Sequence, residues 1–303
     1  MKTARYLPLL LCLLPAAQAF ADTPLDVSHP AAPTAHITIS NVKGEVTVTT
    51  WNRNEVHVGG KLGDGAEPLA IEGSENNLTI NVQAKGHGQS GWFNWGGENA
   101  MAPTDLEVTV PRGASLKINV VSAQASVDGI DGGDIDVNSV SGRLRIHAQT
   151  PVLNAVSVSG SVAFSGHAEQ AKLQTVSGDI LAPSLGGKVE LQTVSGRIQA
   201  GGGPWQQLSL STVSGDVQLS GGLAADGSMS VDSMSGDVQL QFPATLNSNV
   251  HVNTFSGDLR SDFGTPTHPE HGPGSALDAV AGNGRGKIHI ETFSGDVRIR
   301  KSD

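Results

Sequence analysis

The sequence contains one cysteine, Cys12, and it lies within the first 21 residues. A single thiol excludes an intramolecular disulfide, so the folded chain has to be stabilised by its apolar core. The roughly 280 residues that follow are enough to bury such a core. We therefore expect a fold that does not depend on disulfides.

Basic and aromatic residues are also scarce. The chain has 19 lysines and arginines against 29 aspartates and glutamates, a formal net charge of -10, and aromatic residues make up 4%. An acidic surface disfavours nucleic acid and anionic lipid head groups as partners. No stretch shows the apolar periodicity of a helix, so neither a helical fold nor a phosphate site at a helix N-terminus is expected.

The first 21 residues have the features of a secretory signal peptide. Lys2 and Arg5 precede the apolar run Leu7–Leu14, and Ala19 and Ala21 are small residues suited to cleavage. The apolar run is too short to span a bilayer. We expect export to the periplasm or the cell surface, with no transmembrane segment in the mature chain. Cleavage leaves 17 basic and 29 acidic residues, a net charge of -12.

The rest of the chain is dominated by a repeat built on Ser-Gly, most clearly in Thr-Val-Ser-Gly-Asp-Val. Its glycines are separated by 18, 18, 18, 19, 21, 21 and 38 residues. Self-similarity of this period is typical of arrays whose units bury their apolar face only by stacking on neighbours. The eight corner glycines are Gly142, Gly160, Gly178, Gly196, Gly215, Gly236, Gly257 and Gly295.

Apolar and polar residues alternate on both sides of each glycine. The positions seven and five before it and two after it are apolar in every unit, as Leu208, Leu210 and Val217 are around Gly215. The alternation changes phase between the Thr or Ser three before the glycine and the Val, Met or Phe two before it, which predicts a bend. Glycine suits such a corner if φ is positive or if a Cβ would collide with the next layer.

Two folds fit this pattern. A β-hairpin per repeat with Ser-Gly as its turn would give a propeller or a barrel. Stacked parallel coils explain better why one residue type recurs at one position, because layers about 4.8 Å apart place equivalent residues in a single file. We therefore predict an all-β β-solenoid of stacked 18–21-residue coils with Ser-Gly-Asp corners.

The regular repeat covers only part of the chain. We expect residues 22–35, rich in proline and small residues, to be a flexible leader. Residues 36–115 are predicted to combine a degenerate repeat with a β-rich cap over the open end, and residues 116–303 to form the solenoid. The segment 261–286 has three prolines and six glycines and is predicted to be a loop extruded before the last unit, 287–300.

Aspartate follows the corner glycine in five units, and Asp216 and Asp237 occur in consecutive ones. At the spacing of one coil, two carboxylates lie about as far apart as the catalytic pair of a retaining glycosidase, and a file of aspartates also suits calcium. The simpler interpretation, which we favour, is a turn residue that faces water.

Two other motifs are interpreted as structural. Gly86–Gly91 spells G-x-G-x-x-G, but aromatic residues follow it instead of an apolar helix, so nucleotide binding is rejected. The segment His268–His271 offers two imidazoles and a carboxylate without the spacing of a helical zinc motif, and we expect a solvated loop. No catalytic residue, metal ligand or cofactor is predicted.

Three of the few aromatic residues, Trp92, Phe93 and Trp95, fall within four positions. They are expected either to cover the apolar end of the solenoid, which we favour, or to form a stacking surface for sugars or a protein partner.

Three features in this order resemble the bacterial putative-adhesin family, a domain of unknown function: Ile39–Val46, Val108–Ala114 and the repeated Thr-Val-Ser-Gly-Asp-Val. The resemblance covers roughly residues 36–300 and implies an exported β-solenoid associated with the cell envelope, without catalytic residues to carry over. We expect a non-enzymatic structural or adhesin-like interaction module with an unidentified partner and a link to envelope stress. The alternative is a glycan-active enzyme or a carbohydrate-binding protein that uses the aspartates or the aromatic segment.

Overall fold

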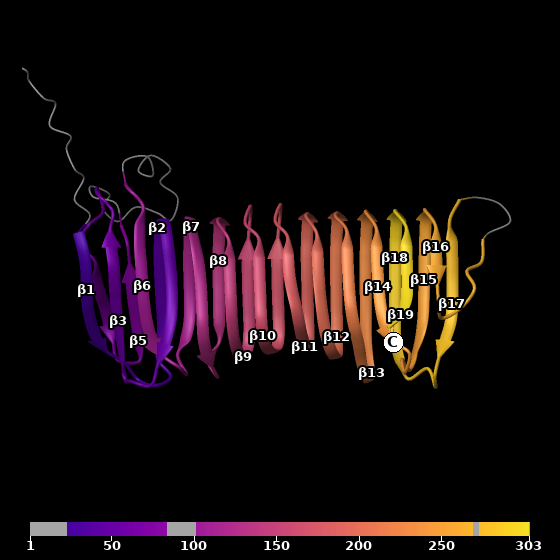
Figure 1. Ribbon diagram of the computed structural model, residues 1–303, viewed down its shortest axis with the longest axis horizontal. Coiled ribbons are helices and arrows are strands. Elements are labelled where there is room, and N and C mark those ends of the chain that lie inside the picture. The colour runs from indigo at the N-terminus through magenta and orange to yellow at the C-terminus, as the bar shows by residue number, and fades with distance from the viewer. Residues whose placement is uncertain (1–22, 84–100, 269–272, 303) are drawn as a thin grey trace, which may run out of the picture.

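The computed structural model describes residues 23–83, 101–268 and 273–302, and every regular element within these ranges is a β-strand (Figure 1). The first nine strands are β1 (Thr23–Pro30), β2 (His36–Trp51), β3 (Glu55–Leu62), β4 (Ala70–Ser74), β5 (Asn77–Asn81), β6 (Thr104–Pro111), β7 (Ser115–Asp131), β8 (Ile135–Ser141) and β9 (Leu144–Ser157). The others are β10 (Val162–Thr175), β11 (Ile180–Ser195), β12 (Ile198–Ser214), β13 (Val217–Ser235), β14 (Val238–Pro243), β15 (Ser248–Ser256), β16 (Leu259–Ser261), β17 (Ser275–Ala281), β18 (Gly286–Ser294) and β19 (Val297–Ser302).

Successive coils pair in parallel with an offset of one repeat. Leu191 of β11 lies opposite Leu210 of β12, which lies opposite Val231 of β13. Equivalent repeat positions are therefore neighbours in adjacent layers, as a solenoid requires and as one hairpin per repeat does not allow. The predicted β-solenoid fold is confirmed. Among the described residues, none forms a helix with the length and hydropathy needed to cross a membrane.

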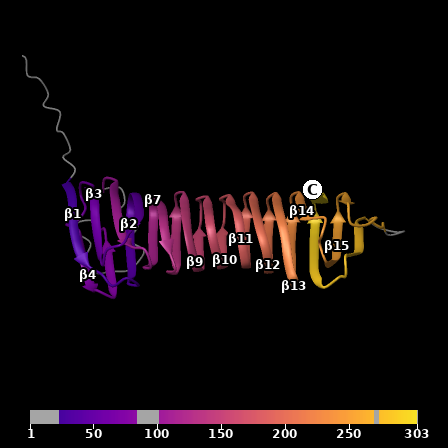
Figure 2. The same cartoon turned by 60° about the horizontal axis from the view of Figure 1, so that its bottom comes forward.

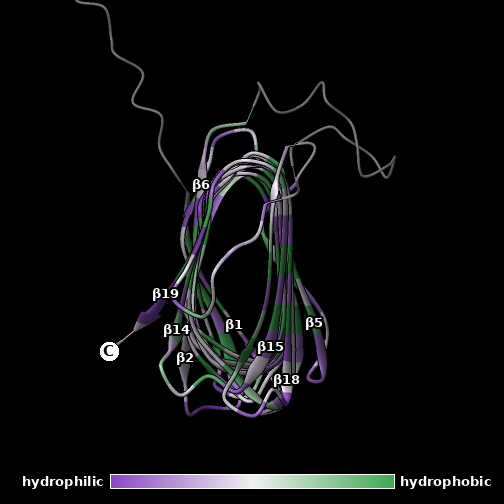
Figure 3. Cartoon of the chain, turned by 90° about the vertical axis from the view of Figure 1, so that its right-hand side faces the viewer, coloured by the Kyte–Doolittle hydropathy of each residue, from purple (hydrophilic) through white to green (hydrophobic). Residues whose placement is uncertain are grey.

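Viewed along the stack, each coil is a flattened loop with two long walls (Figure 3). The alternating apolar residues of both walls are buried inside it. Leu208 and Leu210 on one wall and Val217 and Leu219 on the other are each at most 2% exposed. A fully buried side chain of this size contributes about 1.5–3 kcal/mol. The period-two alternation thus supplies one apolar core that runs the length of the stack.

Residues 23–35, which the sequence predicted to belong to a flexible leader, are ordered against the cap. Strand β1 pairs antiparallel with β3 from Thr23 opposite Leu62 to Pro30 opposite Glu55, and the following Ala31 is 2% exposed. The prolines that suggested disorder are compatible with a strand here because, among the described residues, β1 pairs with β3 alone. A short, proline-containing edge strand also blocks further strand addition.

The first repeat lies inside the stack. Ile39 of β2 has Ile80 of β5 on one side and Ile118 of β7 on the other. Strand β3 then pairs antiparallel with β6, and β4 pairs antiparallel with β5. The end of the solenoid is thus closed by the β-rich cap that the sequence predicted.

The C-terminal repeat also lies inside the stack. The layers therefore do not follow the order of the chain, although the sequence predicted 287–300 as the last unit. Strand β18 lies between β13 and β15, so that Ile290 has Val231 on one side and Val252 on the other. Figures 1 and 2 show the C-terminal strands, in yellow, set between the layer of β14 and the layer of β15. The segment 261–286 is also more than a loop, because β17 within it pairs antiparallel with β15. The sequence could not show this, since a step of 38 residues fits either order.

Candidate interaction surface

The Ser-Gly corners of successive coils form one edge of the stack. The Thr or Ser three residues before each corner glycine points inward, as at Thr175, which is 5% exposed. Its Oγ1 donates to the carbonyl oxygen of Gly178 at 2.6 Å, and Thr254 donates to the carbonyl of Gly257 at 3.2 Å. At these two corners a buried hydroxyl therefore bonds the backbone on the far side of the bend and helps to hold the corner closed.

The corner glycines lie so close to the next layer that a side chain has no room. An added Cβ on any of the eight would lie between 1.7 and 2.5 Å from a carbonyl oxygen of the neighbouring layer; for Gly215 this is the oxygen of Gly196, at 1.9 Å. Four of the eight also have a positive φ, between 119° and 145°, namely Gly142, Gly236, Gly257 and Gly295. Layer contact is the reason that all eight share.

The residues two before each glycine point into solvent and form a continuous row, which we call the apolar ridge. Each is between 37% and 59% exposed. Eight layers about 4.8 Å apart make a ridge roughly 34 Å long. In order along the stack, the apolar ridge consists of Val140, Val158, Val176, Val194, Val213, Met234, Phe293 and Phe255.

The largest side chains of the apolar ridge lie at its C-terminal end. Met234 is 59% exposed, Phe293 58% and Phe255 54%. The two phenyl rings stack with their centroids 4.9 Å apart and their planes within 6°. Inserting β18 between β13 and β15 is what places Phe293 between Met234 and Phe255, so the bulkiest apolar groups form one uninterrupted patch.

A file of aspartates runs beside the apolar ridge and is used by the backbone. Asp216 Oδ1 accepts the N–H of Asp237 at 3.2 Å, and Asp237 Oδ1 accepts the N–H of Asp296 at 3.1 Å. Asp296 Oδ1 in turn accepts the N–H of Asp258 at 2.9 Å. The side chains are exposed, as a turn residue should be, but each carboxylate also ties its corner to the next layer.

The remaining candidate residues from the sequence are only partly described. Trp92, Phe93 and Trp95 lie outside the described residues, as do Gly86–Gly91, Glu270 and His271. His268 is described, and its Nδ1 lies 3.0 Å from Ser275 Oγ. Within the described ranges, no group of three or more His, Cys, Asp or Glu side chains is arranged to hold a metal ion.

Sequence reasoning did not identify the apolar ridge, although the signal was present. The phase of the alternation changes at Val213 and its equivalents, and this change predicts a bend in the strand but not which side chains the bend exposes. The bend turns two consecutive residues, Val213 and Ser214, outward, while Thr212 stays 3% exposed. The signal is an apolar residue that recurs in all eight coils at a position that the bend turns toward solvent.

The comparisons with known proteins give a family and distant structures. A family model described as Toastrack DUF4097 matches residues 34–300. No curated protein matches the chain. Among solved structures, the chain is similar to a putative adhesin from Bacteroides fragilis NCTC 9343, with 12% identity, a TM-score of 0.45 and coverage of 93% of this chain and 99% of that one. A putative adhesin from Parabacteroides distasonis ATCC 8503 has 11% identity, a TM-score of 0.40 and coverage of 92% and 98%. A third protein, described as a putative lipid binding protein from Parabacteroides distasonis ATCC 8503, has 13% identity, a TM-score of 0.29 and coverage of 92% and 97%.

Proposed function

The chain belongs to the Toastrack DUF4097 family, and from this premise we propose that it is a non-enzymatic, adhesin-like interaction module exported to the bacterial cell envelope. The observation that carries the proposal is the apolar ridge, eight exposed apolar side chains in consecutive layers. Contiguous apolar patches that are exposed to water on soluble proteins often mark interaction sites. The stacking of the coils does not require the side chain at this position to be apolar, since it points away from the core.

The ridge also indicates the character of its partner. Met234, Phe293 and Phe255 belong to the residue types that are enriched at the centres of interfaces. The carboxylates of Asp237, Asp296 and Asp258 run parallel to these three side chains. A protein surface with an apolar stripe flanked by basic residues complements both rows, because the acidic file steers the approach and the ridge supplies the buried area.

The alternative, a glycan-active enzyme, is less well supported by the aspartates. A retaining glycosidase needs one carboxylate free to attack and a second kept protonated by its surroundings. Asp237 Oδ1 accepts a backbone N–H, as does Asp216 Oδ1, and both side chains are exposed. Neither aspartate lines the groove of β12, β13, β14 and β19 or the smaller hollow beside Pro243.

Export and the link to envelope stress rest on the sequence. The predicted signal peptide, residues 1–21, lies outside the described residues. Intact-mass measurement of the protein recovered from the periplasm or medium should give a chain that starts at Asp22, or at Phe20 if cleavage follows Ala19. A chain that retains Cys12 would contradict a soluble exported form. Increased expression under envelope damage would support the stress link, and unchanged expression would remove it.

The ridge is tested by a variant that keeps the core. Phe255→Ser combined with Phe293→Ser removes two exposed rings, so the melting temperature should stay within a few degrees of the parent protein. Binding to isolated envelope fractions, measured by co-sedimentation of outer-membrane vesicles and of peptidoglycan, should fall at least about tenfold, since a buried ring contributes about 1.5–3 kcal/mol.

The matched control replaces two exposed apolar residues away from the ridge. Val152 is 39% exposed and Val280 is 67% exposed, so Val152→Ser with Val280→Ser removes apolar surface elsewhere. This control should bind envelope fractions like the parent. Equal binding by the ridge variant and the parent would refute the ridge as the interaction surface.

A further inference from the structure

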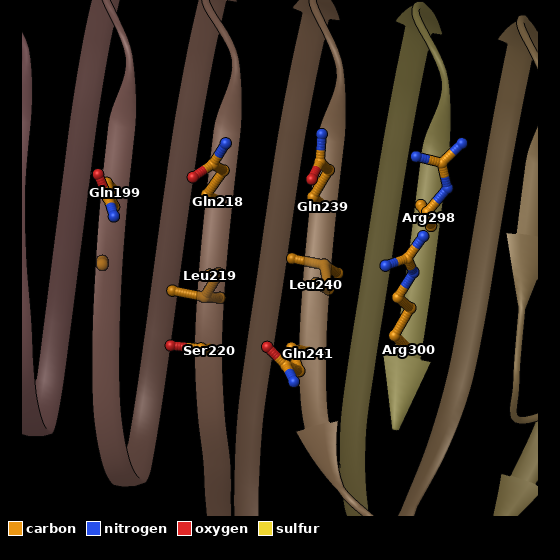
Figure 4. Close-up of a pocket in the computed structure, with 10 residues that line it drawn as sticks. Gln199, Gln218, Leu219, Ser220, Gln239, Leu240, Gln241, Arg298 and Arg300 are labelled. Atoms are coloured by element: carbon orange, nitrogen blue, oxygen red, sulfur yellow. The ribbon is translucent and has the colours of Figure 1, made fainter. Parts of the chain in front are cut away.

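A second surface feature lies on the wall that follows the corner. It is a groove of about 280 Å³ that spans the layers of β12, β13, β14 and β19. Figure 4 shows its side chains projecting in two rows from neighbouring strands. We call it the glutamine–arginine groove and define it by Gln199, Gln218, Gln239, Gln241, Arg298 and Arg300.

The strand register builds these two rows. In the first row Gln218 lies opposite Gln239, which lies opposite Arg298. In the second row Gln241 lies opposite Arg300. Residues two apart on a strand share one face, so both rows point outward from the same wall. The insertion of β19 beside β14 places the two arginines next to the glutamines.

The polar groups of the groove are free of protein partners. Within the described residues, none of the six side chains makes a hydrogen bond or an ion pair with the protein. Elsewhere in the stack, the amides of Gln174 and Gln192 bond each other across adjacent layers. The neighbouring Arg260 is paired with Asp258, with the Nη2 and Oδ2 atoms 3.5 Å apart. The glutamine–arginine groove is therefore a set of open donors and acceptors.

The arginines make the groove positive in a chain whose formal charge is -10. Arg298 lies opposite Arg260 in the next layer, and Arg300 follows on the same face. Arg260 is paired with Asp258, whereas Arg298 and Arg300 have no ion pair among the described residues, and like charges close together are unfavourable when nothing compensates them. An anionic ligand relieves this repulsion, and a planar guanidinium binds carboxylates through two parallel hydrogen bonds.

We propose that the glutamine–arginine groove binds an acidic polysaccharide strand that lies along the axis of the stack. Each glutamine amide offers both a donor and an acceptor, which suits sugar hydroxyls. The distance between layers is about 4.8 Å. It is close to the length that one pyranose unit adds to an extended polysaccharide chain. The glutamine rows take the hydroxyls, and Arg298 with Arg300 takes the carboxylates.

An acidic peptide is a poorer fit to the same groove. Extended peptides are usually bound by pairing with a free strand edge, and the groove lies on strands that pair on both sides. The apolar residues beneath it, Ala200, Leu219 and Leu240, are at most 4% exposed, so they offer no pocket for a peptide side chain. Recognition has to come from the side-chain amides and guanidinium groups.

The experiment uses the mature protein and three polymers, namely oligogalacturonate, neutral dextran and polyglutamate, with affinity measured by isothermal titration calorimetry. The parent should bind oligogalacturonate more tightly than polyglutamate and should not bind dextran. Arg298→Gln with Arg300→Gln should weaken oligogalacturonate binding about tenfold to a hundredfold. Gln218→Ala with Gln239→Ala should weaken the binding of oligogalacturonate. The weaker binding of polyglutamate, which depends on the arginines, should stay at the level of the parent.

The control for charge is Arg143→Gln with Arg145→Gln, two exposed arginines outside the groove, of which Arg145 lies three layers before Gln199. It should bind oligogalacturonate like the parent. No binding by the parent, tighter binding of polyglutamate, or equal loss in the control would each overturn the proposal. The ridge variant Phe255→Ser with Phe293→Ser leaves the groove intact, so failure here and failure of the ridge are separate results.

Discussion

Phe293 and Phe255 stack in adjacent layers, with ring centroids 4.9 Å apart, although 38 residues separate them in the chain. The later residue lies nearer the middle of the stack, because β18 pairs with β13 on one side and with β15 on the other. The last coil of the chain is therefore an internal layer.

The first coil is held in the same way. Strand β2 lies between β7 and the layer formed by β5 and β6, while β1, β3 and β4 are added outside it. In an ordinary solenoid the terminal repeat contacts one neighbour and frays first. Here both terminal repeats contact two neighbours, so fraying of the outermost layer does not release either repeat.

Deleting residues 286–303 should therefore be far more damaging than the loss of an outer coil. The deletion removes the buried residues Ile288, Ile290, Val297 and Ile299 and leaves β13 and β15 without their common neighbour. Burial of these four side chains alone corresponds to about 6–12 kcal/mol, which is comparable to the whole stability of many domains. We expect no cooperative melting transition at the parent temperature, as followed by circular dichroism.

A chain shortened only by Ser302 and Asp303 is the control and should melt like the parent. If the chain lacking residues 286–303 kept the parent melting temperature, the C-terminal coil could not be an internal layer.

Gly215→Ala tests the contact between layers. The added Cβ would lie 1.9 Å from the carbonyl oxygen of Gly196, and φ at Gly215 is not positive, so the cost is steric. We expect a loss of roughly 2–4 kcal/mol in urea unfolding, since the parallel layers cannot separate locally. Gly186→Ala is the control, because its nearest contact would be His167 at 3.6 Å. Similar unfolding free energies for the two variants would show that the corner glycine tolerates a side chain.

Most of the fold could be predicted from the sequence because the same pattern of apolar positions recurs in each coil. The positions of Leu208, Leu210 and Val217 repeat in every unit, and the parallel register follows from that repetition. The order of the layers could not be predicted. Val250 and Ile288 carry the same repeat signature, and no local feature tells which of them pairs with Met229.

The surface was harder to predict than the core. Val213 is apolar like its inward neighbours, and only the geometry of the bend shows that it is 45% exposed. The glutamine–arginine groove depends on Arg298 lying beside Gln239, and therefore on the inserted β19. The prolines of β1 suggested disorder because sequence alone does not show that this strand pairs on one side.

Among the described core residues, we expect substitution of Trp205 to lower the free energy of unfolding the most. It is 0% exposed, and its Nε1 donates to the carbonyl oxygen of Leu185 at 2.9 Å. Trp205→Phe leaves this buried carbonyl without its partner and creates a void, so we expect a loss of about 2–4 kcal/mol. Trp51→Phe is the matched control, since Trp51 also donates to a carbonyl, that of Glu55, but is only half-buried. The unfolding free energy should fall clearly less for Trp51→Phe, and the reverse order would contradict the burial of Trp205.

Asp216 tests whether the aspartate file ties the corners together. Its Oδ1 accepts the N–H of Asp237 in the next layer at 3.2 Å, so Asp216→Ala should lose about 0.5–1.5 kcal/mol of stability. Asp216→Asn keeps an acceptor oxygen and removes one charge from a row of like charges, so it should be at least as stable as the parent. Urea unfolding of the three proteins measures both differences. If Ala and Asn variants are equally stable, the carboxylate serves no structural purpose at the corner, and its presence beside the apolar ridge has to be explained by the partner that the ridge binds.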